Sequence, residues 1–270
     1  MECISIFCRL CIISLMFVVS SAGNAFGQSI PKVMIILDDL GNNQSDMSAF
    51  SLPDEVTFSI LPQTPWAKKI AKKAQLEGRA VMLHMPMQAI NGKYMGPLGV
   101  TIDMSPDELI STFRQALSSV PYAVGVNNHM GSAFTAQLYA MHTIMEEIKH
   151  RGLFFVDSRT SINTTAQKVA EELGVPNTRR QVFLDHERTP AFLHQQFEHM
   201  KALAKKNGMV VVIAHPYPET LAFLEQYLPE LEKEGMMLTS IADHLSSHAN
   251  ADKRNAIVGS QTSQRALLNN

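Results

Sequence analysis

The chain has 270 residues, of which 46% are hydrophobic, so it is long enough to bury one large core or two small ones. A formal net charge of −2 and a pI of about 6.5 lack the basic excess typical of nucleic-acid-binding proteins. Charged residues make up only 18% of the chain, which argues against a disordered protein. Composition therefore predicts a folded globular protein and no nucleic-acid partner.

Residues 1–27 have the composition of a secretory signal peptide. An apolar stretch over residues 10–19 follows Arg9 and gives way to small and polar residues. This stretch is too short to span a bilayer, so we expect cleavage near Ala25 or Gly27 and a periplasmic or secreted protein without a stable membrane span. An uncleaved N-terminal anchor is the alternative. All three cysteines lie in this segment, so the mature protein would contain no disulfide.

Behind the signal segment, apolar runs alternate with helical segments. The runs, which we interpret as strands, lie near residues 33–37, 56–61, 79–83, 123–126, 153–156, 180–184, 209–214 and 236–241. Start and stop signals bound helices at 65–76, from Ser105, at 165–173, from Thr189 to Gly208, and at 218–234. This alternation predicts an α/β fold, a distorted or incomplete (β/α) barrel of seven to eight parallel strands. We expect the barrel to occupy residues 30–245 and a mobile C-terminal tail to occupy residues 246–270.

Polar groups follow most of the predicted strands, and in parallel α/β sheets these positions share one edge, where active sites are assembled. An enzyme is therefore expected. The groups are Asp38 and Asp39, His84, Asn127 to His129, Asp157 to Arg159, Asp185 and His215.

Several of these groups stand in motifs that resemble the polysaccharide deacetylase superfamily, in particular its divergent branch of secreted bacterial proteins. The resemblance covers residues 32–245. The motifs are Leu37-Asp38-Asp39-Leu40-Gly41, Leu83-His84-Met85-Pro86-Met87, Gly125-Val126-Asn127-Asn128-His129-Met130-Gly131-Ser132, Asp157-Ser158-Arg159-Thr160 and His215-Pro216.

The resemblance implies a distorted (β/α) barrel that removes N- or O-acetyl groups from glycans with a divalent metal, usually zinc. Asp39 then matches a metal ligand and Asp38 the general base. His84 matches the first ligand histidine, and His215 matches the general acid.

The chain departs from the superfamily pattern at two places. Gln88 stands where the second ligand histidine belongs, and the usual arginine-proline-aromatic motif has no clear counterpart. We propose His129 as the replacement third ligand, because one carboxylate and two imidazoles with an open position form an ordinary hydrolytic zinc site. Four further residues are expected to orient the site or bind sugar hydroxyls: Asn128, Asp157, Arg159 and Asp185.

Each assignment has a structural alternative. Adjacent carboxylates point in opposite directions unless the strand breaks after Leu37, and Asp38 with Asp39 can instead cap the following segment. Each histidine can serve a structural role: His84 by bonding a backbone carbonyl, His129 by stabilising a turn, and His215 as a buried, satisfied polar group. Asp157 and Arg159 can pair with each other.

Three functions agree with these residues. The leading one is a secreted, metal-dependent carbohydrate deacetylase that acts on envelope or extracellular glycans. The second is a catalytically weak or inactive glycan-binding or envelope protein on the same scaffold, which Gln88 and the missing arginine motif favour. The third is another metal hydrolase, such as an amidase or phosphoesterase, because the residues define water activation and leave the substrate open. The sugar, the linkage and the oligomeric state stay open.

Overall fold

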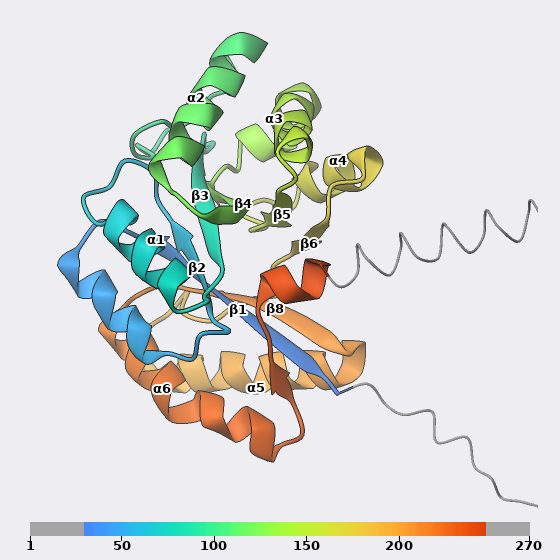
Figure 1. Ribbon diagram of the computed structural model, residues 1–270. Helices are drawn as coiled ribbons and strands as arrows, with labels where there is room; N and C mark the ends of the chain where they lie inside the picture. The colour runs from blue at the N-terminus through green and yellow to red at the C-terminus, as the bar shows by residue number, and fades with distance from the viewer. Residues whose placement is uncertain (1–29, 247–270) are drawn as a thin grey trace, which may run out of the picture.

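The computed structural model describes residues 30–246, which form one curled sheet of parallel strands with helices around its outer side (Figure 1). Eight strands are hydrogen-bonded in the order β6-β5-β4-β3-β2-β1-β8-β7, and β9 pairs with β1. The strands are β1 (Lys32–Leu40), β2 (Thr57–Ile60), β3 (Val81–Met87), β4 (Ala123–Met130), β5 (Phe154–Asp157), β6 (Asn177–Arg179), β7 (Val182–Phe183), β8 (Met209–Ala214) and β9 (Met237–Leu238).

The predicted signal peptide, residues 1–27, lies outside the described residues, and so does the predicted tail apart from Ser246. Within residues 30–246, no helix combines the length and the apolar character needed to cross a membrane.

The two ends of the sheet lie close together without pairing with each other. β6 pairs with β5 and β7 pairs with β8, at opposite ends of the strand order, yet only Arg180 and Gln181 connect β6 to β7. Three residue steps span at most about 10 Å, so the sheet must curl until its ends almost meet. The N–H of Arg180 donates to the carbonyl of Asp157, and the N–H of Gln181 donates to that of Val211. The predicted incomplete (β/α) barrel is confirmed.

The five predicted helices lie close to where the sequence signals place them, whereas no such signals were identified for the helices at 44–51, 134–136 and 138–150. Ser105 accepts a hydrogen bond from the N–H of Glu108, whose carboxylate accepts the N–H of Ser105, so a capping box begins the helix predicted from Ser105. Thr189 caps the N-terminus of α5 by accepting the N–H of Phe192. The described helices are η1 (Gln44–Ser51), α1 (Ala67–Leu76), α2 (Pro106–Ser119), η2 (Phe134–Ala136), α3 (Leu138–His150), α4 (Ala166–Leu173), α5 (Pro190–Asn207) and α6 (Pro218–Lys233).

The strands differ from the prediction in two respects. β6 was not predicted, because its sequence Asn-Thr-Arg is polar and its place at one end of the sheet requires no apolar run. β1, β3 and β4 also continue beyond their apolar runs, to Leu40, Met87 and Met130. Asp38, Asp39, His84 and Asn127 to His129 therefore lie within strands and not in the loops behind them, whereas Ser158 and His215 directly follow β5 and β8.

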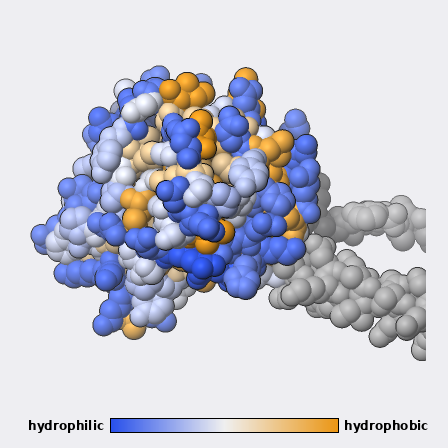
Figure 2. All heavy atoms as spheres, turned by 90° about the horizontal axis from the view of Figure 1, so that it is seen from above, coloured by the Kyte–Doolittle hydropathy of each residue, from blue (hydrophilic) through white to orange (hydrophobic). Residues whose placement is uncertain are grey.

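Alternate residues of each strand face two different cores. In β1, Val33, Ile35 and Leu37 belong to the large cluster beneath the helices, whereas Met34 and Ile36 belong to a smaller cluster on the concave side. The other members of the concave cluster are Met82, Phe154, Val156, Val211, Ile213, Ile241 and Leu245. The face seen in Figure 2 is mainly hydrophilic, with apolar side chains in separate spots, as expected when both cores are buried.

Gly125 makes room for the concave core. It pairs with Phe154 across β4 and β5, and a Cβ atom built at Gly125 would overlap the Phe154 ring. We expect Gly125→Ala to lower the free energy of unfolding by about 1–3 kcal/mol through overpacking. Urea unfolding measures this change. Val124→Ala on the exposed side of the same strand is the control and should stay within about 0.5 kcal/mol. Equal stabilities of the two variants would contradict this account of the core.

Candidate metal centre

A local irregularity of β1 brings two adjacent carboxylates to the same site. The register between β1 and β2 shifts between Leu37 and Leu40, and Asp39 has φ of 61°, in the left-handed region. Adjacent residues of a regular strand face opposite sides, but a bulge changes the direction of the chain. Asp38 therefore continues the concave row of Ile36, while the turn at Asp39 directs its carboxylate to the same edge. This bulge explains how the carboxylates of Asp38 and Asp39 reach the same site although the two residues are adjacent in the sequence.

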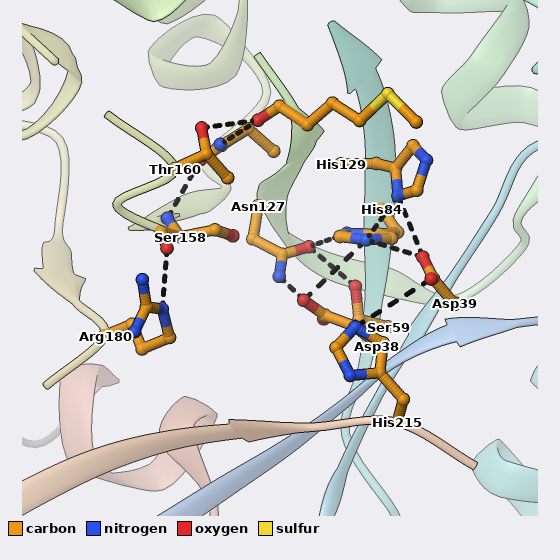
Figure 3. A network of polar contacts seen from close by, with 12 residues as sticks. Asp38, Asp39, Ser59, His84, Asn127, His129, Ser158, Thr160, Arg180 and His215 are labelled. Atoms are coloured by element: carbon orange, nitrogen blue, oxygen red, sulfur yellow. Dashed lines mark hydrogen bonds and ion pairs between the residues drawn. The ribbon is translucent and has the colours of Figure 1, made fainter. Parts of the chain in front are cut away.

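Asp39, His84 and His129 converge on one point (Figure 3). The Oδ1 atom of Asp39 lies 2.8 Å from Nδ1 of His129 and 3.1 Å from Nε2 of His84. The two ring nitrogens are 3.2 Å apart. The three side chains come from the neighbouring parts of β1, β3 and β4, so the predicted ligands, including the replacement ligand His129, are brought together.

The geometry of this cluster fits a metal ion better than a set of hydrogen bonds. Asp39 Oδ1 is buried and forms no regular hydrogen bond, although two ring nitrogens lie within 3.1 Å of it. Ligand atoms about 2.0–2.1 Å from a tetrahedral zinc ion lie about 3.3 Å from one another, close to the three separations observed. One carboxylate and two imidazoles are also a usual donor set for catalytic zinc.

Buried charges set the protonation of the cluster without a metal. Burial of His84 by itself would lower its pKa, but the carboxylates of Asp38 and Asp39 outweigh burial and raise the pKa to about 9. Burial of Asp39 opposes ionisation, yet the close rings of His129 and His84 hold the pKa of Asp39 well below its ordinary value. The metal-free cluster therefore holds a proton on His84 that a metal ion would displace.

Asp38 lies beside the cluster and is 3% exposed. Its Oδ1 accepts a hydrogen bond of 2.8 Å from Nδ2 of Asn127, and its Oδ2 lies 3.7 Å from Nε2 of His84. Burial raises the pKa of Asp38, although His84 and His215 act in the opposite direction. A carboxylate with a raised pKa and no coordinating contact is suited to accept a proton.

His215 lies on the other side of Asp39, with its Nε2 atom 3.8 Å from Oδ2 of Asp39. Asp185 accepts hydrogen bonds from Nδ1 of His215 at 2.9 Å and from the His215 N–H at 2.7 Å. The hydroxyl of Thr220 also donates to Asp185. Burial alone would lower the pKa of His215, but Asp185, with smaller contributions from Asp38 and Asp39, outweighs burial and raises it. Asp185 thus fixes the ring and keeps it protonated to higher pH, which suits a proton donor.

Two other predicted positions serve the backbone around the centre. Asn128 accepts the N–H of Ser158 and donates to the carbonyl of Met130, so it ties the end of β4 to the segment after β5. Gln88 accepts the N–H of Ile102 and holds the loop between β3 and α2. These backbone contacts engage both side chains, and neither side chain belongs to the three-ligand cluster.

Asp157 contacts Arg159 through the backbone N–H of Arg159. Asp157 is fully buried, and its carboxylate accepts the N–H of Arg159 and the hydroxyl of Thr164. Arg180 donates to the carbonyls of Ser158 and Arg159. These contacts shape the loop between β5 and α4, so contact of Asp157 or Arg159 with a sugar stays a prediction.

The sequence places Asn127 and Ser158 at the edge of the sheet, but no role was predicted for either, and Ser59 was not predicted at all. Asn127 bridges Asp38 and His84, and its Oδ1 also accepts the Ser59 hydroxyl at 2.6 Å. The hydroxyl of Ser158 is buried without a partner and extends toward Asn127 in Figure 3. Strand alternation was the available signal: Asn127 shares a face with His129, two residues on, whereas Asn128 faces the other side.

The chain is similar to known proteins in sequence and in fold. The family described as divergent polysaccharide deacetylase matches residues 35–245. The uncharacterised protein YibQ of Escherichia coli (strain K12) is 35% identical over 201 residues, which are 74% of this chain and 63% of that protein. The chain thus spans less than two thirds of the length of this relative.

Two crystal structures share the fold. An uncharacterised protein from Agrobacterium tumefaciens C58 has a TM-score of 0.76 and 24% identity, over 79% of this chain and 88% of that one. The catalytic domain of peptidoglycan N-acetylglucosamine deacetylase from Eubacterium rectale has a TM-score of 0.51 and 13% identity, over 78% of this chain and 88% of that one. With the family match over most of its length, the chain belongs to the divergent polysaccharide deacetylase family.

Proposed function

We propose that the protein is a secreted, zinc-dependent hydrolase that removes acetyl groups from envelope or extracellular glycans. The observation that carries this proposal is the convergence of Asp39, His84 and His129, in which the buried Oδ1 atom of Asp39 has no hydrogen-bond partner. Two groups suited to proton transfer, Asp38 and His215, flank the same point. Membership of the family and the shared fold of a peptidoglycan deacetylase support acetyl groups as the target.

The residues divide the chemistry of hydrolysis between them. Zinc held by the three ligands supplies polarisation of the acetyl carbonyl and a lowered pKa for water. Asp38 takes a proton from the water that attacks the carbonyl carbon. His215 gives a proton to the leaving nitrogen or oxygen as its bond to the acetyl carbon breaks, so the products are acetate and a free amine or hydroxyl.

A glycan-binding protein with little hydrolysis is the second candidate, and Gln88 is the observation that favours it. The Gln88 side chain is engaged by the backbone of Ile102, so this position supplies no ligand to the cluster. Another metal hydrolase, an amidase or a phosphoesterase, is the third, because the proton-transfer groups do not define the leaving group. The three candidates differ in whether acetate is formed.

Acetate release separates these candidates. Zinc-loaded protein should release acetate slowly from at least one member of a panel of acetylated glycans. Asp38→Asn and His215→Ala should retain zinc and lose about 10² to 10⁴ in turnover, the usual contribution of positioned proton transfer. Asp39→Asn and His84→Ala should lose zinc and turnover together.

The control for these variants is His150→Ala, because His150 is exposed at the end of α3. It should match the wild type in zinc content and turnover. Zinc-loaded wild type that binds glycans but releases no acetate from any glycan, ester or amide would replace the enzyme with the binding protein.

Zinc binding should depend on pH, because zinc must displace the proton of His84. With the pKa of metal-free His84 at about 9, binding near neutral pH should release about one proton per ion, and affinity should rise about tenfold per pH unit. Calorimetry in two buffers of different protonation enthalpy counts the protons, and chelator competition gives the affinity. Zinc affinity that does not change between pH 6.5 and 8.5 would be incompatible with this assignment.

The rate at alkaline pH should depend on Asp185. His215 must be protonated to act as the acid, so turnover falls as pH rises through its pKa, which Asp185 raises. Asp185→Asn should therefore move the alkaline limb of the kcat profile to lower pH, whereas Glu187→Gln, an exposed carboxylate two residues on, should leave it in place. An unmoved limb in Asp185→Asn would mean that another group supplies the proton.

A further inference from the structure

Asn127 occupies the point where the metal cluster and the flanking carboxylate meet. Its side chain is fully buried and makes three hydrogen bonds. Nδ2 donates to Oδ1 of Asp38 at 2.8 Å, while Oδ1 lies 2.8 Å from Nδ1 of His84 and 2.6 Å from the Ser59 hydroxyl. Figure 3 shows the amide between Asp38 and His84, with its two ends turned to the two residues.

These contacts fix the orientation of the amide and of the His84 ring. A carboxylate accepts hydrogen bonds, so the amide nitrogen of Asn127 must face Asp38 and its oxygen must face His84. The oxygen in turn requires a hydrogen on Nδ1 of His84. The Nε2 atom of His84, which faces Asp39, is then the nitrogen that coordinates a metal ion.

We propose that Asn127 is a positioning residue whose two amide ends have separate tasks, one for metal binding and one for catalysis. Its oxygen sets the ring of the ligand His84, and its nitrogen orients the base Asp38. This inference rests on the proposed function for the role of Asp38, but its statement about His84 concerns zinc affinity alone.

The position of Asn127 on the sheet makes it suited to this task. β4 lies between β3 and β5, and Asn127 is in register with His84 on one side and with Val156 on the other. Both neighbours hold its backbone, so the amide is presented from a rigid element. Aspartate at this position would keep the acceptor and lack the donor, and leucine of similar size would lack both.

That difference between aspartate and leucine provides the test. At pH 8, Asn127→Asp should bind zinc no more than about threefold more weakly than the wild type, because it keeps the acceptor for His84. It should turn over at least about 10²-fold more slowly, because a second carboxylate that repels Asp38 replaces the donor to Asp38. Asn127→Leu should weaken zinc binding by about 10- to 100-fold and also lose turnover. Zinc affinity comes from chelator competition, turnover is measured at saturating zinc, and the Tm of each metal-free variant verifies folding.

Asn207→Asp and Asn207→Leu are the matched controls. Asn207 is exposed at the C-terminal end of α5, two residues before β8 begins and therefore at the opposite end of the barrel from the centre, so both variants should match the wild type. If Asn127→Leu does not fold, Asn127→Ala removes the same two contacts with a smaller side chain and carries the same expectation.

Zinc affinity of Asn127→Leu within threefold of the wild type would overturn the role at His84. Turnover of Asn127→Asp within threefold would overturn the role at Asp38. If the wild type itself releases no acetate, the proposed function fails, and the zinc measurements still decide whether Asn127 sets the ring of His84.

Discussion

The bulge in β1 is the constraint on which the site depends. Two adjacent carboxylates serve one centre only if the backbone changes direction between them, and the left-handed conformation of Asp39 makes this change. For a residue with a Cβ atom this conformation costs of order 1 kcal/mol, and stabilising contacts elsewhere must offset this cost. The rest of β1 provides such contacts, because it pairs with β8 in regular register from Lys32 to Leu37 and buries apolar side chains on both faces.

The concave side of the sheet is layered, and the layers explain why the centre forms at one edge. Near the middle of the strands, alternate side chains build a dry cluster that includes Ile36, Val156 and Ile213. Two residues further along each strand, the same rows continue as polar groups: Asp38, Ser158 and His215. Only Arg180 and Gln181 connect β6 to β7, so the sheet is curled. The curl brings the ends of β1, β5 and β8 close to one another on the concave side. The polar groups are thus packed against the buried apolar cluster on the side toward the middle of the strands.

Charge balance holds this layer together. Three carboxylates and three imidazoles lie at the centre, and Asp38 and Asp185 are buried to 3% exposure each. A buried carboxylate is costly unless hydrogen bonds or opposite charges compensate it. Asp185 has three donors from His215 and Thr220, Asp39 faces two imidazoles, and Asp38 has the neutral amide of Asn127. The three acids are therefore in different environments, and each environment suits a different role.

Much of the fold and part of the site follow from the sequence. Apolar runs and helix caps such as Ser105 and Thr189 give the order of the elements, because burial periodicity and capping are local properties. The resemblance to the family predicted Asp39 and His84 as metal ligands and His215 as the general acid. The short polar strand β6 could not be predicted, because its pairing with β5 depends on the curl of the sheet and not on its own side chains.

Tertiary structure decided which of the two alternating rows of polar residues faces the centre. Asn127 and Asn128 are chemically identical neighbours, yet one bridges Asp38 and His84 and the other holds a loop. The bulge at Asp39, the orphaned oxygen it presents, and the pairing of His215 with Asp185 across 30 residues also require the assembled sheet. The reason is physical: the phase of a strand is set by register and bulges against its neighbours, and one residue of shift reverses every side chain. The sequence determined which chemical groups reach the edge of the barrel, and the pairing of the strands determined which of them meet.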